Sequence, residues 1–545
     1  MASVCGIGGL IFWLLTDHDY SSPLAPDRQA LATFVAVATI AFALTTQRLR
    51  WSWSVGFALL WGLITAFVGW FSASYDRSGD IFEWPYFSGL FATLLAAPLF
   101  QTVRDEAAWR FPYPRLHGHV WGDAIIAAAS LFFTGLTFLL AWLIAGLFDL
   151  IGIRALSELL EKGWFGWTLA GFAFGAAVGI LRERDRLVPA LQGLAAAVLS
   201  VLAPVLAFAL VAFLISIGFT GLQGLWDSWV SATALLLAAS AGAVVLVNAV
   251  IAESRDHGSQ NAVLRVSALV LTAVILPLAI LAALAMGLRI DQYGWTPERI
   301  WGAIAIAVAA IYGLGGWWAI IKARRDFDDP LRPVQTRLAI GLCALALVLA
   351  LPILDFGAIS ARSQLARLEE GKVEPARFDW TAMAFDFGPA GRDRLAEISR
   401  SGPSAWRDDA RRALNADDRW ALGDRTVSAE EASELAARIR LIPGDLELPP
   451  AIWDRIAAQR LCLPTSECAL LRLDEERFLL VTAAEDGEHI ASTLVDMGEV
   501  SNDPARPEAP VEQSAVDLDS ATIELRPVQR RQLYVDARPV GEPIE

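Results

Sequence analysis

The sequence has few charged residues. Asp, Glu, Lys and Arg make up 19% of the 545 residues, whereas about a quarter of an average soluble protein is charged. Hydrophobic residues make up 55%, and the mean hydropathy is +0.45. A water-soluble chain of this size could not bury so much apolar surface. The scarcity of charge therefore excludes a disordered chain and indicates a protein of the lipid bilayer.

Cysteine and basic residues are also scarce. Four cysteines are too few for a disulfide-rich secreted module. The 44 Lys and Arg residues are outnumbered by 59 Asp and Glu residues, which excludes a basic nucleic-acid-binding protein. The sequence lacks a Walker-type phosphate loop, Gly-x-Ser-x-Gly and His-Glu-x-x-His. We therefore expect no cofactor, no metal and no catalytic residue that a short motif would identify.

Long uncharged runs fill the first two-thirds of the chain. A hydrocarbon core about 30 Å thick is crossed by roughly 20 apolar residues in an α-helix, and continuous runs predict helices rather than barrel strands. We expect eleven spans, the first being short enough to suggest a clipped helix. They cover residues 3–16, 30–46, 53–73, 86–103, 124–148, 163–181, 187–219, 229–252, 266–288, 300–321 and 338–356.

Charge is unevenly distributed along the chain. Residues 357–545 carry 23 Lys or Arg and 36 Asp or Glu, so most of the net charge of −15 follows the last span. Alternate connections between the spans carry 15 and 6 basic residues. Because cytoplasmic loops are enriched in Lys and Arg, we expect a cytoplasmic N-terminus and a periplasmic C-terminal region.

After the last span, the sequence predicts two regions. Residues 357–461 predict a helical stalk, with helices at 359–370, 391–400, 403–415, 428–439 and 448–461. Residues 462–545 predict a small antiparallel sheet, with strands at 469–473, 477–482, 489–495, 522–526 and 531–535. Cys462 and Cys468 flank a Pro-containing loop. In an oxidising compartment this spacing favours a local disulfide, with two free thiols as the alternative.

Three segments resemble a known family. Tyr293-Gly-Trp-Thr-Pro-Glu-Arg299 resembles the signature of bacterial polytopic membrane proteins grouped as domain of unknown function 4153. The segments Phe111–Trp121 and Ser360–Leu368 are similar to two further parts of that family. The likeness covers most of residues 50–400. It implies a bacterial inner-membrane protein with several spans, and it assigns no catalytic residue because the family has no established activity.

The segment around Tyr293 has a structural and a functional interpretation. Thr296 and Pro297 suit the N-cap and first position of the next span, and Glu298 suits its first turn. In the functional interpretation, Asp291, Tyr293, Glu298 and Arg299 form a polar cluster at the outer face that binds a lipid head group or a small solute.

The segment before the fifth span is expected to be a cytoplasmic loop at the lipid head groups. Its motif contains Tyr113, His119 and Trp121, together with His117. Two histidines two positions apart could share a metal ion, but a specific site needs a third or fourth ligand. We therefore favour the interfacial loop. Another polar segment, residues 326–329, is expected to be a solvated turn.

Polar residues inside the spans are few. Gly171, Gly175 and Gly179 repeat every fourth position, which is typical of close helix packing. Asn248 is expected to form a hydrogen bond between helices. Asp149 and Asp355 lie near the outer ends of their spans, where a carboxylate can reach the interface.

The sequence thus predicts an all-α polytopic membrane bundle over residues 1–356, with a C-terminal extramembrane α+β domain. We expect a non-enzymatic protein that senses or scaffolds envelope processes. The alternatives are a permease for an uncharged or lipidic molecule and a transferase acting on a lipid-linked substrate. A cavity at the membrane midplane would favour the permease, and a polar groove open to the outer leaflet would favour the transferase. We expect the lipid bilayer as a partner, and no nucleic acid. The sequence does not decide whether the chain binds envelope proteins or forms a homo-oligomer.

Overall fold

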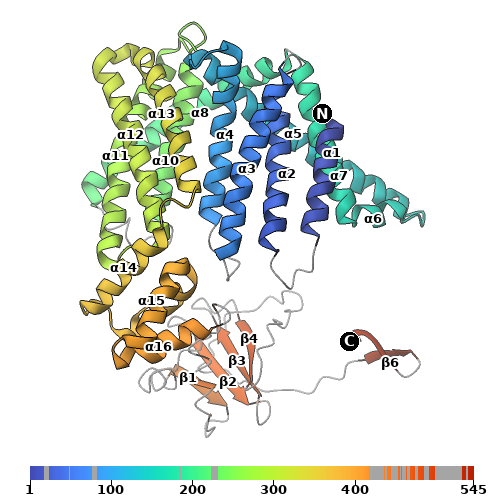
Figure 1. The fold of residues 1–545 in the computed structure, drawn as a ribbon, viewed down its shortest axis with the longest axis vertical. Helices are drawn as coiled ribbons and strands as arrows, with labels where there is room; N and C mark the ends of the chain where they lie inside the picture. Colours follow the sequence, from blue (N-terminus) through green and yellow to red (C-terminus); the bar gives the residue numbers. More distant parts are fainter. Residues whose placement is uncertain are drawn as a thin grey trace. The chain divides into compact units, whose positions relative to one another are not determined.

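A computed structural model gives the fold (Figure 1). It describes residues 1–17, 24–47, 50–75, 83–184, 186–221 and 231–416, and shorter segments between 419 and 544 that include the strands. The chain divides into two compact units, Met1–Leu414 and Asn415–Glu545. Each unit is described by itself.

The first unit is a bundle of long apolar helices (Figure 1). Its helices are α1 (Ala2–Thr16), α2 (Pro26–Thr45), α3 (Trp51–Tyr75), α4 (Glu83–Glu106), α5 (Tyr113–Asp149), α6 (Ala155–Leu160), α7 (Gly163–Glu183), α8 (Leu187–Thr220), α10 (Ala232–Ile251), α11 (Ala262–Tyr293), α12 (Pro297–Ala323) and α13 (Asp328–Ala350). Among the described residues, ten helices are long and apolar enough to cross a membrane, which confirms ten of the predicted spans. The remaining one, α1, has 15 residues and is shorter than a full crossing requires.

Two boundaries differ from the prediction. The expected loop over residues 113–121 is wrong, because these residues form the first turns of the 37-residue helix α5. The last span was expected to reach residue 356, but α13 ends at Ala350. Leu351 has an extended backbone (ψ 148°), as expected for a residue that precedes a proline, here Pro352.

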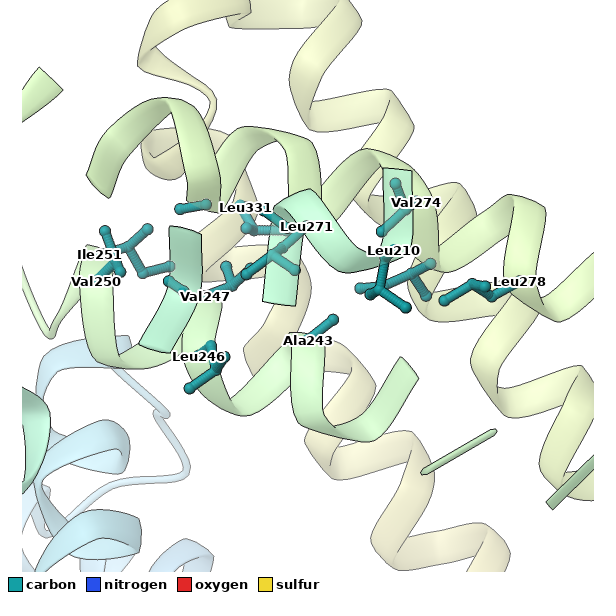
Figure 2. Packing of buried hydrophobic residues seen from close by; sticks show 14 of the residues in the cluster. Leu210, Ala243, Leu246, Val247, Val250, Ile251, Leu271, Val274, Leu278 and Leu331 are labelled. Atoms are coloured by element: carbon teal, nitrogen blue, oxygen red, sulfur yellow. The ribbon is translucent and has the colours of Figure 1, made fainter. Parts of the chain in front are cut away.

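The largest core cluster lies between α8, α10 and α11 (Figure 2). The cluster includes Leu210 of α8, Val247 of α10 and Leu271 of α11, and Leu331 of α13 adds to it. Small buried residues such as Ala243 allow the helices to approach closely. Elsewhere large apolar side chains face outward, as Phe132 of α5 does. An apolar exterior of this kind is the surface that a lipid bilayer covers.

Short helices follow the membrane helices within the first unit. They are α14 (Phe356–Glu369), a 3₁₀ turn (Pro375–Arg377), a π-helical segment (Ala382–Asp386), α15 (Gly388–Ser401) and α16 (Ser404–Asn415). The three α-helices match the expected stalk helices at 359–370, 391–400 and 403–415. Met383, Phe387 and Leu395 are buried among them.

The second unit contains two small sheets. A four-stranded sheet has the order β1 (Ile439–Ile442), β2 (Glu467–Arg472), β3 (Arg477–Ala483) and β4 (Ile490–Asp496). A two-stranded sheet pairs β5 (Arg531–Val535) with β6 (Arg538–Ile544). Leu470 and Leu480 face each other across β2 and β3 and are fully buried. Cys462 and Cys468 form a disulfide beside this core, with their Cα atoms 6.1 Å apart.

The sheet differs from the predicted one in two respects. β1 pairs with β2 in parallel, so the sheet is mixed and not purely antiparallel. Ile439 begins a strand, although it was expected near the end of a helix, and β6 was not predicted. The expected strand at 522–526 lies outside the described residues, as do most of the residues expected to form helices at 428–439 and 448–461. The proposed domain boundaries at residues 356 and 461 stay a prediction.

Candidate functional site

The turn between α11 and α12 carries the expected outer cluster. The backbone of Gly294 has a φ of +75° and ends α11. A Cβ atom at Gly294 would lie 2.7 Å from Arg367 Cδ, so both the backbone and the space favour glycine. Pro297 begins α12 and Glu298 lies in its first turn, as expected. Thr296 occupies the N-cap position, but its side chain makes no capping hydrogen bond.

Helix α14 contacts this turn through three polar side chains. Gln364 Nε2 donates hydrogen bonds to the carbonyl oxygens of Tyr293 (2.9 Å) and Trp295 (3.0 Å). Arg367 donates to the carbonyl oxygens of Asp291 (3.0 Å) and Gln292. The Trp295 N–H donates to Ser363 Oγ at 3.1 Å. We call these five hydrogen bonds the stalk contact. Three of the five satisfy carbonyl groups in the last turn of α11, which lack partners within the helix.

Asp291, Tyr293 and Arg299 of the expected cluster have different roles in this turn. Arg299 donates to the carbonyl oxygens of Tyr293 (3.1 Å) and Gly294 (2.6 Å). Its guanidinium carbon lies 5.5 Å from the centre of the Tyr293 ring, which is a cation–π distance. Asp291 contributes its main-chain carbonyl to the stalk contact. The turn therefore binds α14 mainly through main-chain acceptors, whereas the sequence suggested a cluster of polar side chains.

The motif at the start of α5 lies at the other end of the bundle. Tyr113 Oη donates to Asn248 Oδ1 at 2.9 Å, which joins α5 to α10. His117 Nδ1 lies 3.1 Å from Tyr113 Oη, and the His117 ring stacks on Trp121. His119 Nε2 instead lies 3.1 Å from Asp105 Oδ2. The two histidines thus have separate partners, and the described residues hold no group of three potential metal ligands.

A buried ionic network surrounds His119. Arg104, only 1% exposed, bonds to Asp105 at 3.0 Å and to the carbonyl oxygen of Thr45. Asp123 accepts a hydrogen bond from Gln101 at 2.6 Å and lies 3.5 Å from Arg182. The network joins the ends of α2, α4 and α7 to the first turns of α5. One member of this network, Asp123, could be noticed in the sequence because it follows the histidine motif.

A second ionic network joins α10, α11 and α13. Arg332 donates to Asp328 at 3.0 Å and to the carbonyl oxygen of Ile251 at 2.9 Å. Arg265 of α11 donates to Asp328 at 3.3 Å. Asp328 is 2% exposed, so the interpretation of residues 326–329 as a solvated turn is wrong at this position. Sequence reasoning missed it because its arginine partners lie 4 and 63 positions away.

The glycine repeat of α7 faces α1. A Cβ atom at Gly171 would lie 2.1 Å from the Cys5 carbonyl oxygen, and one at Gly175 would lie 2.7 Å from Cys5 Cβ. At Gly179 a Cβ atom would meet Met1 Cβ at 3.5 Å, an ordinary contact. Close packing of α1 on α7 therefore depends on the first two glycines.

The two carboxylates at the span ends have local partners. Asp149 accepts a hydrogen bond from Ser157 Oγ at 2.9 Å. Asp355 caps α14, because its Oδ1 accepts the Ala358 N–H at 2.8 Å.

In the part of the chain that the structure describes, ten apolar helices with an extramembrane extension define a multi-pass helical membrane protein. A family model described as domain of unknown function (DUF4153) matches residues 31–397, about two-thirds of the chain. The chain belongs to this family. The matched range includes the stalk contact and both ionic networks. No curated protein and no solved structure matches the chain.

Proposed function

We propose that this chain is a bacterial inner-membrane protein that senses or scaffolds envelope processes through its extramembrane region. The stalk contact carries the proposal. It ties the first helix after the last span to the α11–α12 turn by five hydrogen bonds from three side chains. A scaffold or sensor requires such a joint, because a surface presented outside the membrane must keep its position relative to the spans.

The proposed orientation places the N-terminus in the cytoplasm and residues 357–545 in the periplasm. The 15-to-6 distribution of basic residues between alternate connections supports it. The disulfide between Cys462 and Cys468 fits an oxidising compartment. Reporter fusions after Arg325 and Glu370 test it: the first should report cytoplasm and the second periplasm. The same signal from both would contradict a membrane crossing by α13.

The alternatives make different demands on the structure. A transferase acting on a lipid-linked substrate needs an open polar groove at Asp291, Glu298 and Arg299, but α14 occupies one side of this turn. A permease needs a path through the bundle, and the largest core cluster fills the space between α8, α10 and α11 with side chains (Figure 2). These observations favour the scaffold or sensor over both alternatives.

Complementation of a deletion strain tests the proposed role. The strain would receive the full chain, a chain ending after Leu414, or full-length Gln364→Ala/Arg367→Ala, each checked for equal amounts in the membrane. A scaffold or sensor predicts that envelope defects, measured as detergent sensitivity, persist with the truncated chain and partly persist with the double variant. Arg362→Ala, an exposed change on the same helix, is the control. Full complementation by the truncated chain would contradict the proposal.

A further inference from the structure

A cavity of about 380 Å³ lies where the membrane helices meet the stalk helices of the first unit. Its walls come from the end of α3, the start of α4 and α12, the α13–α14 turn, the π-helical segment and the start of α15. Apolar side chains form most of the wall, among them Phe71, Leu349 and Phe385. Ligand pockets commonly enclose about 300–1,000 Å³ and are mostly apolar, so this cavity has the size and lining of a small binding site.

The apolar wall continues onto the surface that faces lipid. Leu354 lines the cavity and is 49% exposed. On α3, the Phe71 ring in the wall lies 6.4 Å from that of Phe67, which is 46% exposed on the same helix. In a bilayer, lipid acyl chains cover such a surface. The occupant most available to this cavity is therefore an acyl chain of a neighbouring lipid.

The polar groups of the wall carry opposite charges. Its polar side chains are Ser72, Trp301, Asp355 and Arg392, and the last two carry the charges. Helix α15 begins in the wall at Gly388, and the N-terminus of a helix favours negative charge. Arg392 and this helix end suit a phosphate group, whereas the Asp355 carboxylate suits an ammonium group. The wall therefore matches a head group that carries both charges.

We propose that this cavity binds one acyl chain of a phospholipid whose head group combines a phosphate with an ammonium group. The chain lies against Phe71, Leu349 and Phe385. The phosphate lies beside Arg392 and the start of α15, and the ammonium group lies beside Asp355. The cavity volume suits a single chain, with the rest of the lipid in the bilayer. The proposal does not depend on the scaffold or sensor role, because it concerns binding alone.

Native mass spectrometry of the delipidated full-length protein tests this proposal. The probes are phosphatidylethanolamine, phosphatidylglycerol and oleate, each added separately. We expect one tightly retained phosphatidylethanolamine, and at least about tenfold weaker retention of the other two probes. Leu354→Trp should weaken retention about tenfold by filling the cavity. Ile353→Trp is the matched control, because Ile353 is the neighbouring residue, is 63% exposed and does not line the cavity.

A second variant tests the head group without changing the cavity volume. Asp355→Asn keeps a residue that caps helices well but removes the negative charge. It should lower the preference for phosphatidylethanolamine over phosphatidylglycerol about tenfold. Equal retention by the wild type, Leu354→Trp and Ile353→Trp would mean only lipid on the outer surface and would overturn the site. Equal retention of all three probes by the wild type would overturn the assigned head group.

Discussion

The two ends of the membrane bundle are held together by different kinds of contact. At the stalk end, partly exposed side chains of α14 bind main-chain carbonyl groups of the α11–α12 turn. At the opposite end, here called the ionic end, the buried arginines Arg104 and Arg332 each pair with a carboxylate of their own helix and donate to a main-chain carbonyl group of another helix. Water can replace a partly exposed hydrogen bond, but it cannot reach a buried ion pair. The helices at the ionic end should therefore stay packed together, whereas α14 can separate from the α11–α12 turn at a moderate cost in free energy.

A substitution at the ionic end should cause the largest loss of stability. Asp328→Ala would remove the buried carboxylate 3.0 Å from Arg332 and leave this arginine only Asp329, which is 51% exposed. Removing one partner of a buried ion pair typically costs about 3–5 kcal/mol. Thermal unfolding in detergent would measure it as a large fall in the unfolding temperature. The control is Asp326→Ala, because Asp326 pairs with Arg255 at an exposed position. Similar effects of the two changes would contradict a special role for the buried pair.

Gly294→Ala should have the next largest effect. It places a side chain at a φ of +75° and forces Arg367 and Gln364 to move, which we expect to cost about 1–3 kcal/mol. The control is Gly287→Ala in the same helix, where no atom lies within 4 Å of the added Cβ. Stability in detergent would be compared for both variants. A neutral result for Gly294→Ala would mean that α14 can leave the turn freely.

Gln364→Ala removes two hydrogen bonds of the stalk contact. Because the site is partly exposed and water can bind the released carbonyl groups, we expect a loss of about 1–2 kcal/mol. Hydrogen exchange should increase in the C-terminal half of α14, which carries the stalk contact, while the ionic end stays protected. Increased exchange at both ends would show that the two ends open together, and the comparison between them would fail.

Tyr113→Phe should have an effect similar to that of Gln364→Ala. It removes the hydroxyl and with it two hydrogen bonds, to Asn248 and to His117, each of which contributes about 0.5–1.5 kcal/mol. Tyr312→Phe is the control, because the Tyr312 hydroxyl makes no hydrogen bond among the described residues. If thermal unfolding showed equal effects for the two variants, the hydrogen bond between α5 and α10 would contribute nothing to the stability of the ionic end.

The spans were predictable because each is a local property of the sequence. Twenty apolar residues in a row leave the backbone no alternative to helix in a bilayer. The start of α5 was not predictable in this way, because Pro114, Gly118 and two histidines are typical of a loop. Its helix is joined to other helices by Tyr113–Asn248 and His119–Asp105. Contacts between distant segments of this kind cannot be read from local pattern.

The candidate site was predictable only as separate segments. The sequence singled out the Tyr293–Arg299 turn and the Ser360–Leu368 segment, but not their contact, because Gln364 lies 71 positions from Tyr293. Strand β1 was missed for a similar reason. Ile439–Ile442 extends a helical pattern, and its strand conformation depends on parallel pairing with β2, about thirty residues later.

The stalk contact has a practical consequence for dividing this chain into fragments. A fragment that stops where the last span stops would discard α14 and return the final carbonyl groups of α11 to water. It would also remove the buried Met383 and Leu395 from the same compact unit. A fragment that continues to Asn415, the end of α16, keeps these groups covered. For biochemical work on the membrane part, the fragment should therefore end after α16 and not after α13.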